Sequence, residues 1–157
     1  LLLPDGVEVR PVTPEHYRAI WEHDVEAFRD HWGYAESQFS LEEFLDFPDY
    51  TDPALWRVAW HGDQIVGQVL SFIDPRENEK YGRKRGYTEG ISVKGEYRRQ
   101  GIASALIAHS LRALKERGME EAALGVHTEN PNGAFRLYEK MGYRVVKLFA
   151  TYRKPLD

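Results

Sequence analysis

The sequence contains no cysteine, no long hydrophobic run and no surplus of positive charge. Zero cysteine among 157 residues excludes disulfides, a thiolate metal site and a cysteine nucleophile. No apolar run approaches the roughly 18 residues that a membrane span needs, and no signal-peptide core follows the N-terminus. Lys and Arg number 21 against 25 Asp and Glu, which argues against a dedicated nucleic-acid binder. We therefore expect a cytoplasmic protein that binds neither a membrane nor nucleic acid.

The length and the histidine spacing narrow the possibilities further. A chain of 157 residues suits one domain with a real hydrophobic core, so we expect a single domain over residues 1–157. Five of the six histidines, all except His127, show no metal-ligand spacing with one another, so we expect no metal site. These residues are His16, His23, His31, His61 and His109.

Helical and strand-like patterns alternate along the chain, which predicts an α/β or α+β domain. We expect strands over residues 7–12, 55–60 and 65–72, up to residue 93, over 122–126 and within 143–153. We expect helices over residues 13–28, 40–47, 101–117 and 133–140, with Gly118 ending the third of them. The charge-mixed stretch 74–85 is predicted to be a mobile loop.

The most informative segment is the junction between a strand and the helix that begins near Gly101. Arg98 and Arg99 stand at the N-terminal end of this helix, where the positive end of the helix dipole disfavours cations. A bound anion would remove this conflict, and Gly101 and Ala103 would let the backbone approach a diphosphate closely. The alternative is a solvated Arg-Arg turn. The segment is neither a Walker loop nor a dinucleotide fingerprint, because it lacks the required Gly-Lys-Ser/Thr element and two of the three glycines.

Two motifs resemble those of the GCN5-related N-acetyltransferases (GNAT). The segment Ile91-Ser92-Val93…Tyr97-Arg98-Arg99-Gln100-Gly101-Ile102-Ala103 is similar to the acetyl-CoA loop of that family. The run from Asn130 to Tyr143 is similar to its Asn…Ala-x-x-Leu-Tyr-x-x-x-Gly-Phe segment, with Tyr143 in place of Phe. The resemblance implies a central mixed, mostly antiparallel sheet of about six or seven strands, flanked by about four helices. It also implies an acceptor-binding half over 1–75 and an acetyl-CoA-binding half over 86–143.

The resemblance assigns cofactor contacts residue by residue. Ile91, Ser92 and Val93 would pair their backbone with the pantetheine arm of acetyl-CoA, and Asn130 would hydrogen-bond it. Asn130 could instead be a turn former before Pro131, and Asn132 could take its role. The diphosphate would be held by a loop that Arg98 opens. The loop amides are those of Arg99, Gln100, Gly101, Ile102, Ala103 and Ser104.

Two residues carry the catalytic hypothesis. Tyr138 matches the family tyrosine that protonates the departing CoA thiolate, although it could instead be a core residue of its helix. Glu89 is our candidate for the general base, on the expectation that it shares a strand face with Ile91 and Val93. A merely solvated glutamate is the alternative, and His127 is a second candidate base.

The sequence thus predicts an acetyl-CoA-dependent N-acyltransferase acting on a primary amine, carried by a small molecule or a peptide. Trp32 and Tyr34 are the aromatic residues that we expect to touch this acceptor. The competing hypothesis is a catalytically silent CoA-binding or structural module. The C-terminal motif and tail are similar to tandem, mycothiol-synthase-like acetyltransferases, of which this chain would be the C-terminal half. The sequence leaves open whether the protein is a monomer, a homodimer or fused to a preceding acetyltransferase domain.

Overall fold

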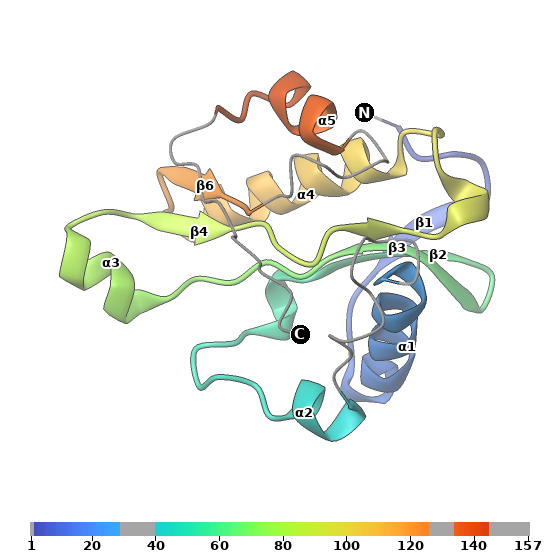
Figure 1. Cartoon of the computed structure of the whole chain (residues 1–157), viewed down its shortest axis with the longest axis horizontal. Helices are drawn as coiled ribbons and strands as arrows, with labels where there is room; N and C mark the ends of the chain where they lie inside the picture. The colour runs from blue at the N-terminus through green and yellow to red at the C-terminus, as the bar shows by residue number, and fades with distance from the viewer. Residues whose placement is uncertain (1, 29–39, 126–133, 145–157) are drawn as a thin grey trace, which may run out of the picture.

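The computed structural model describes residues 2–28, 40–125 and 134–144 (Figure 1). The strands are β1 (Val7–Arg10), β2 (Arg57–His61), β3 (Gln64–Val69), β4 (Arg85–Tyr87), β5 (Ser92–Val93) and β6 (Glu121–Ala123). The α-helices are α1 (Tyr17–Phe28), α2 (Leu41–Leu45), α3 (Pro75–Tyr81), α4 (Ile102–Glu116) and α5 (Ala134–Lys140). Short 3-10 turns are η1 (Pro14–His16), η3 (Pro53–Leu55) and η4 (Gly95–Tyr97).

The strands form a four-stranded and a two-stranded sheet. The first is antiparallel with the order β1-β2-β3-β5, and in the second β4 runs parallel to β6. The predicted mixed, mostly antiparallel α/β fold is therefore confirmed. The described residues contain six strands, and five α-helices rather than about four.

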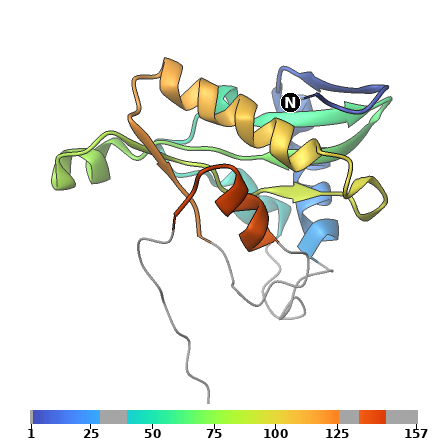
Figure 2. The same cartoon turned by 90° about the horizontal axis from the view of Figure 1, so that it is seen from above.

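Helices cover both faces of the strands. Figures 1 and 2 show α4 and α5 over one face, and Figure 1 shows α1 and α2 on the opposite side. Ile102, Leu106 and Ile107 of α4 pack with Val66 and Val69 in one hydrophobic cluster. On the opposite face, Ile20 of α1 packs in a second cluster, together with Trp56, Val58, Trp60 and Ile65. Burial of these two apolar helix faces holds the layers together.

A β-bulge at Gly90 joins β4 to β5 and shifts the register between them. Gly67 pairs with Val93, whereas farther along β3 the Leu70 N–H donates to the Glu89 carbonyl at 2.8 Å. The strand running through β4 and β5 therefore contains one residue more than its partner over this stretch. Gly90 has φ 61°, a left-handed conformation that glycine adopts readily.

Residues 74–85 contain a helix, so the prediction of a mobile loop is wrong. Asp74 caps α3, because its Oδ1 accepts from the N–H groups of Arg76 and Glu77 at 3.1 and 3.3 Å. Pro75 occupies the first turn, and Gly82 ends the helix in a left-handed conformation at φ 61°. These local signals outweigh the high charge of the segment.

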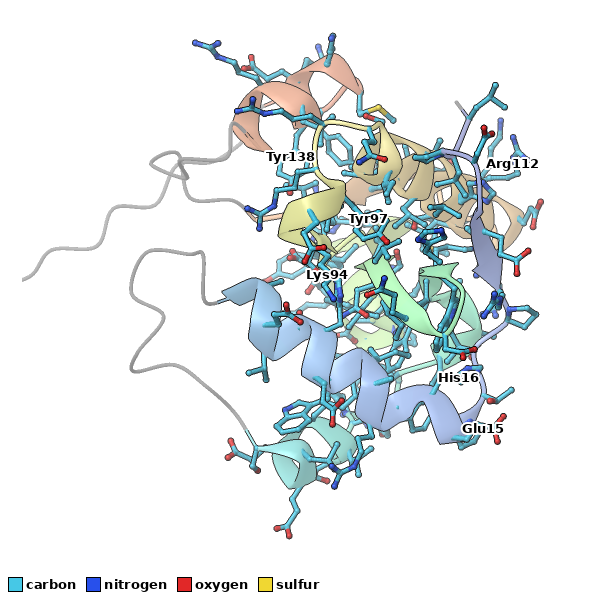
Figure 3. All side chains as sticks on the ribbon, turned by 90° about the vertical axis from the view of Figure 1, so that its right-hand side faces the viewer. Glu15, His16, Lys94, Tyr97, Arg112 and Tyr138 are labelled. Carbon is cyan, nitrogen blue, oxygen red and sulfur yellow. The ribbon has the colours of Figure 1, made fainter. Side chains whose placement is uncertain are left out.

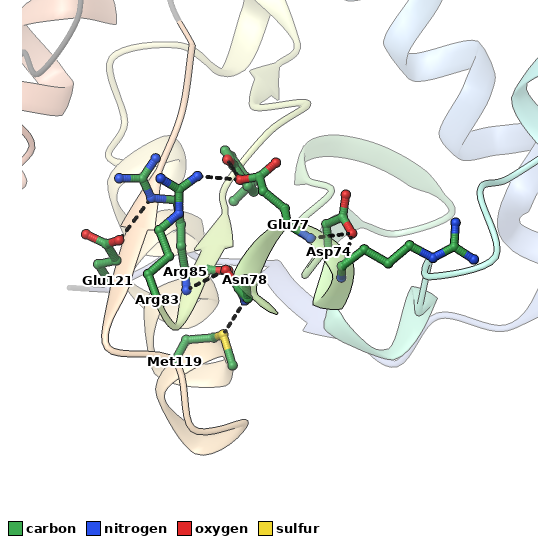
Figure 4. Close-up of polar contacts among 9 residues, drawn as sticks. Asp74, Glu77, Asn78, Arg83, Arg85, Met119 and Glu121 are labelled. Atoms are coloured by element: carbon green, nitrogen blue, oxygen red, sulfur yellow. Dashed lines mark hydrogen bonds and ion pairs between the residues drawn. The ribbon is translucent and has the colours of Figure 1, made fainter. Parts of the chain in front are cut away.

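Polar contacts attach α3 to β4 and to the segment around β6 (Figure 4). The Asn78 side chain donates to the Arg85 carbonyl at 3.0 Å and accepts from the Arg85 N–H at 3.1 Å. Arg83 forms an ion pair with Glu77 at 2.6 Å, and Arg85 forms one with Glu121 at 3.1 Å. The segment is therefore tied to the sheet at several points.

The other described elements follow the predicted order with shifted ends. The predicted hairpin is present, but Leu55 ends η3, so β2 starts later than expected. The strand predicted at 122–126 is β6, which covers three residues and is exposed at Glu121 and half-buried at Ala122 and Ala123. Most of the strand region predicted over 143–153 lies outside the described residues.

Candidate active site

The start of α4 presents backbone N–H groups without a side-chain acceptor. Gly101 is the N-cap residue, with φ 83°, and the first turn of α4 contains no acidic side chain. In any α-helix the first N–H groups lack intrahelical partners. At Gly101 an added Cβ would find no heavy atom within 4 Å, so the space beside this backbone is open. The arrangement suits an anion bound against the backbone.

The two arginines predicted to face this anion lie directly before the helix. Arg99 is exposed and has φ 65°, and within the described ranges no other non-glycine residue has a positive φ. The Arg98 Nε donates to the Val93 carbonyl at 3.2 Å, which ties the loop to β5. Of the other loop residues, Gln100 and Gly101 are exposed, Ala103 and Ser104 are half-buried, and the Ile102 side chain is fully buried in the core.

The loop is held from the hairpin side by a cluster that the sequence did not reveal. The Tyr97 hydroxyl lies 2.6 Å from His61 Nδ1 and accepts from Gln64 Nε2 at 3.0 Å. Lys94 Nζ donates to Gln64 Oε1 at 2.9 Å. Figure 3 shows Lys94 and Tyr97 between α1 and the level of Tyr138. The cluster joins the hairpin of β2 and β3 to Lys94 and Tyr97, which lie about 30 residues farther along the chain.

The predicted pantetheine strand lies at the edge of the four-stranded sheet. β5 pairs with β3 on one side, and the sheet order gives it no strand neighbour on the other side among the described residues. Ile91 and Val93 pack against the cluster under α4. The Ser92 side chain instead faces α1: its Oγ lies 3.0 Å from Nε2 of the buried His23.

Glu89 lies where the two sheets separate. The Thr88 N–H still donates to the Ala123 carbonyl at 2.9 Å, but the Gly125 N–H donates to the Glu89 carboxylate at 3.0 Å. The Gly125 N–H is therefore bonded to the side chain of Glu89 and not to a backbone carbonyl of the neighbouring strand. Burial raises the pKa of Glu89, and the Gly125 hydrogen bond partly offsets this.

The bulge changes which face Glu89 occupies. Glu89 pairs with Leu70, whose side chain packs against the cluster under α1, whereas Ile91 and Val93 contact the cluster under α4. The expectation that Glu89 shares a face with Ile91 and Val93 is therefore wrong. The extra residue at Gly90 reverses the alternation of side chains.

Tyr138 comes to the same region from α5. Burial, and next the negative charge of Glu89, raise the pKa of Tyr138 to about 12. Its ring packs edge-on against Tyr143 with the centroids 6.2 Å apart. The Tyr143 hydroxyl lies 2.7 Å from Oγ1 of the fully buried Thr88. The Tyr138 hydroxyl therefore stays protonated near neutral pH and can donate a hydrogen bond.

Two buried titratable residues of α1, His23 and Asp24, complete the region, and no motif in the sequence assigns a role to either. Burial lowers the pKa of His23 to about 4 and raises that of Asp24 to about 6. Their signal in the sequence is the presence of polar residues on the apolar face of a helix. Asn130, His127, Trp32 and Tyr34 lie outside the described residues.

In the described part of the chain, no helix is long and apolar enough to cross a membrane. Within the same ranges, no three His, Asp or Glu side chains are grouped so that they could hold a metal ion.

Comparison with known proteins gives a consistent result. Residues 17–143 match the family described as the Acetyltransferase (GNAT) family. The chain is 32% identical over 106 residues to an N-alpha-acetyltransferase of Sulfurisphaera tokodaii, over 62% of this chain and 63% of that protein. It is 28% identical over 154 residues to a mycothiol acetyltransferase of Streptomyces scabiei, over 97% of this chain and 47% of that protein.

A solved structure agrees with these sequence matches. The crystal structure of a GCN5-related N-acetyltransferase from Sphaerobacter thermophilus superposes with a TM-score of 0.72 at 29% identity. The match covers 90% of this chain and 42% of the other. The chain thus spans less than two thirds of the length of each of these three relatives.

Proposed function

The chain belongs to the acetyltransferase (GNAT) family, and on that basis we propose that it is an acetyl-CoA-dependent N-acyltransferase in which a primary amine attacks the thioester directly. In this proposal residues 1–75 bind the acceptor and residues 86–143 bind acetyl-CoA. The acceptor amine belongs to a small molecule or a peptide. The cytoplasmic location and the absence of a metal remain predictions.

The start of α4 is the single observation that carries the proposal. Arg98 and Arg99 precede a helix whose first N–H groups have no side-chain acceptor, beside open space at Gly101. These groups fit a diphosphate, and the edge of β5 offers backbone N–H and C=O groups to an extended amide such as pantetheine. Ile91 to Val93, Arg98 to Ser104 and Asn130 are therefore the proposed cofactor-binding residues.

Glu89 is proposed as the general base. A lysine-like amine has a pKa of about 10.4, so only about one molecule in 2,500 is neutral at pH 7. A carboxylate beside the reacting nitrogen can accept the proton that must leave, and burial makes the Glu89 carboxylate more basic than an exposed one. Its place on the α1 face, at the separation of the sheets, supports an approach of the amine from the side of α1.

Tyr138 is proposed as the general acid. Acetyl-CoA would supply the acetyl group as a thioester; as the amine nitrogen bonds to the acyl carbon, the carbon–sulfur bond would break and the departing CoA sulfur would carry the negative charge. A protonated hydroxyl at Tyr138 would donate to this charge. The high pKa of Tyr138 supports this role, because the group that donates must carry its proton at working pH.

The alternative function is a catalytically silent CoA-binding half of a tandem acetyltransferase. The match to mycothiol acetyltransferase, which spans 97% of this chain but 47% of that protein, keeps this alternative in view. The closeness of Glu89 and Tyr138 favours an active enzyme, since a silent module needs neither group there.

Titration calorimetry with acetyl-CoA tests the cofactor, and release of free CoA thiol in the presence of amines tests the activity. We expect binding at a 1:1 ratio, a rise in the melting temperature, and CoA release with at least one member of a panel of polyamines, aminoglycosides and lysine peptides. Binding without release for any amine would favour the silent module. No heat and no thermal shift at millimolar acetyl-CoA would overturn the proposal.

A further inference from the structure

Asp24 is a buried carboxyl group without a partner in the described structure. Its residue surface is 7% exposed, and no hydrogen bond or ion pair joins it to any residue of 2–28, 40–125 or 134–144. Polar groups buried to this extent are nearly always hydrogen-bonded, and buried carboxylates nearly always face a cation. Among these residues the Asp24 carboxyl therefore has neither a cation nor a hydrogen-bond donor as a partner, and its oxygens are not among the side-chain atoms that the fold closes off completely.

Helix geometry fixes the direction in which this carboxyl lies. Residues 17, 20 and 24 follow one line along α1, because they are spaced by three and four. Tyr17 packs on Trp56 with the ring centroids 5.8 Å apart, and Ile20 shares a cluster with Trp56 against which Leu70 packs. This flank of α1 therefore faces the end of β3 at which Leu70 bonds to Glu89.

The neighbouring histidine lies on a different flank of α1, because consecutive helix residues are rotated by about 100° around the axis. His23 Nε2 is 3.0 Å from Ser92 Oγ, and its charged neighbours are Glu26 and Lys94. Burial raises the pKa of Asp24 to about 6, and no charged neighbour is among the causes of this shift. Asp24 is therefore a carboxyl group separate from Glu89, whose own pKa shift comes from burial and the Gly125 hydrogen bond.

We propose that Asp24 is the counter-ion for a second ammonium group of the acceptor, so that the preferred substrate is a dication whose other amine reacts beside Glu89. The inference rests on the proposed acetyltransferase function and specifies its substrate class. An aliphatic diamine or a longer polyamine is the simplest acceptor of this kind. The ammonium would provide both the charge and the hydrogen-bond donors that Asp24 lacks.

Paired probes test the proposal on the full chain saturated with CoA. The dication is 1,4-diaminobutane and the monocation is butylamine, and their dissociation constants are measured by calorimetry. The main variant is Asp24→Asn, with Asp24→Leu as a second replacement. The matched control is Glu22→Gln, which removes the same charge from an exposed position of α1. Acetyl-CoA affinity is measured in parallel for every variant.

We expect the parent to bind the diamine at least tenfold more tightly than the monoamine, since a charge-assisted hydrogen bond is worth roughly that factor or more. Either Asp24 variant should lose this preference, and Glu22→Gln should keep it. Equal binding of the two amines by the parent, or an unchanged preference in a folded Asp24 variant, would overturn the inference. If the parent itself does not bind acetyl-CoA, the proposed function is overturned, whatever the amine result.

Discussion

At the scale of single residues, two neighbouring tyrosines of the C-terminal segment differ in what their hydroxyl groups do. The Tyr143 hydroxyl is hydrogen-bonded to the buried Thr88. The Tyr138 hydroxyl makes no hydrogen bond with any described residue, and it lies near the charge of Glu89. A structural role accounts for the first hydroxyl, and the proposed chemistry accounts for the second.

Removing each hydroxyl should therefore affect a different property. Tyr138→Phe should lower kcat by about 10²-fold, the usual range for a general acid, with little change in acetyl-CoA affinity or stability. Tyr143→Phe, the matched control, should lower the free energy of unfolding by about 1–3 kcal/mol, because it leaves the Thr88 hydroxyl unpaired, while kcat changes less. Steady-state kinetics and urea unfolding measure both. A Tyr138→Phe variant as active as the parent would show that the hydroxyl has no catalytic role.

At the scale of elements, α4 has a glycine in the left-handed conformation at each end. Gly101 has φ 83° and Gly118 has φ 87°, and an added Cβ would meet no heavy atom within 4 Å at either position. The backbone strain of a substitution is therefore similar at the two ends. Only the N-terminal glycine adjoins the proposed diphosphate site.

This symmetry makes Gly118→Val the control for Gly101→Val. Both variants should lose about 1–2 kcal/mol of stability, since a branched side chain disfavours a positive φ. Gly101→Val alone should abolish acetyl-CoA binding in calorimetry, because its side chain occupies the space beside the helix start. Equal acetyl-CoA affinities in the two folded variants would indicate that the loop before α4 is an ordinary turn.

Helix α3 depends on its cap rather than on burial, because it contains no buried residue. Asp74→Ala should cost about 1 kcal/mol in urea unfolding, since Asp74 accepts two backbone N–H bonds. Asp49→Ala is the control, because it removes only an exposed ion pair with Arg76. Acetyl-CoA affinity should stay constant in both. Equal stabilities of the two variants would contradict the capping role.

At the scale of the whole molecule, packing α1 onto the strands buries two groups with opposite titration behaviour. The lowered pKa of His23 gives stability that is present above pH 6.5 and is lost as the pH falls toward 4. The raised pKa of Asp24 gives stability that is present below about pH 4 and is lost as the pH rises through 6. Each change in the free energy of unfolding amounts to about 3 kcal/mol. Because the two changes have opposite signs, the stability of the parent should vary little between pH 4 and 6.

Single substitutions should separate the two effects. Relative to the parent, His23→Gln should become progressively less stable as the pH rises from 4 to 6.5, because Asp24 then titrates without its opposing partner. Asp24→Asn should become progressively more stable over the same range. Urea unfolding at half-unit pH intervals measures both slopes. Slopes of the same sign would show that one of the two side chains is not buried in this way.

The sequence alone determined the features that depend on local patterns. The apolar face of α4, its start at Gly101 and its end at Gly118, the hairpin, and the order of the motifs follow from periodicity, caps and turn residues close together in the chain. The helix α3 is also encoded locally, by Asp74, Pro75 and Gly82, although the high charge of the segment favoured the prediction of a loop.

Only the tertiary structure decided which of these residues meet. The face of Glu89 depends on a bulge whose position is set by pairing with β3, and a shift of one residue reverses every side chain beyond it. The closeness of Glu89 to Tyr138 and the burial of Asp24 arise when α5 and α1 pack onto opposite sides of the strands. Such long-range contacts leave no periodic signal along the chain, because each depends on the partner element rather than on neighbouring residues.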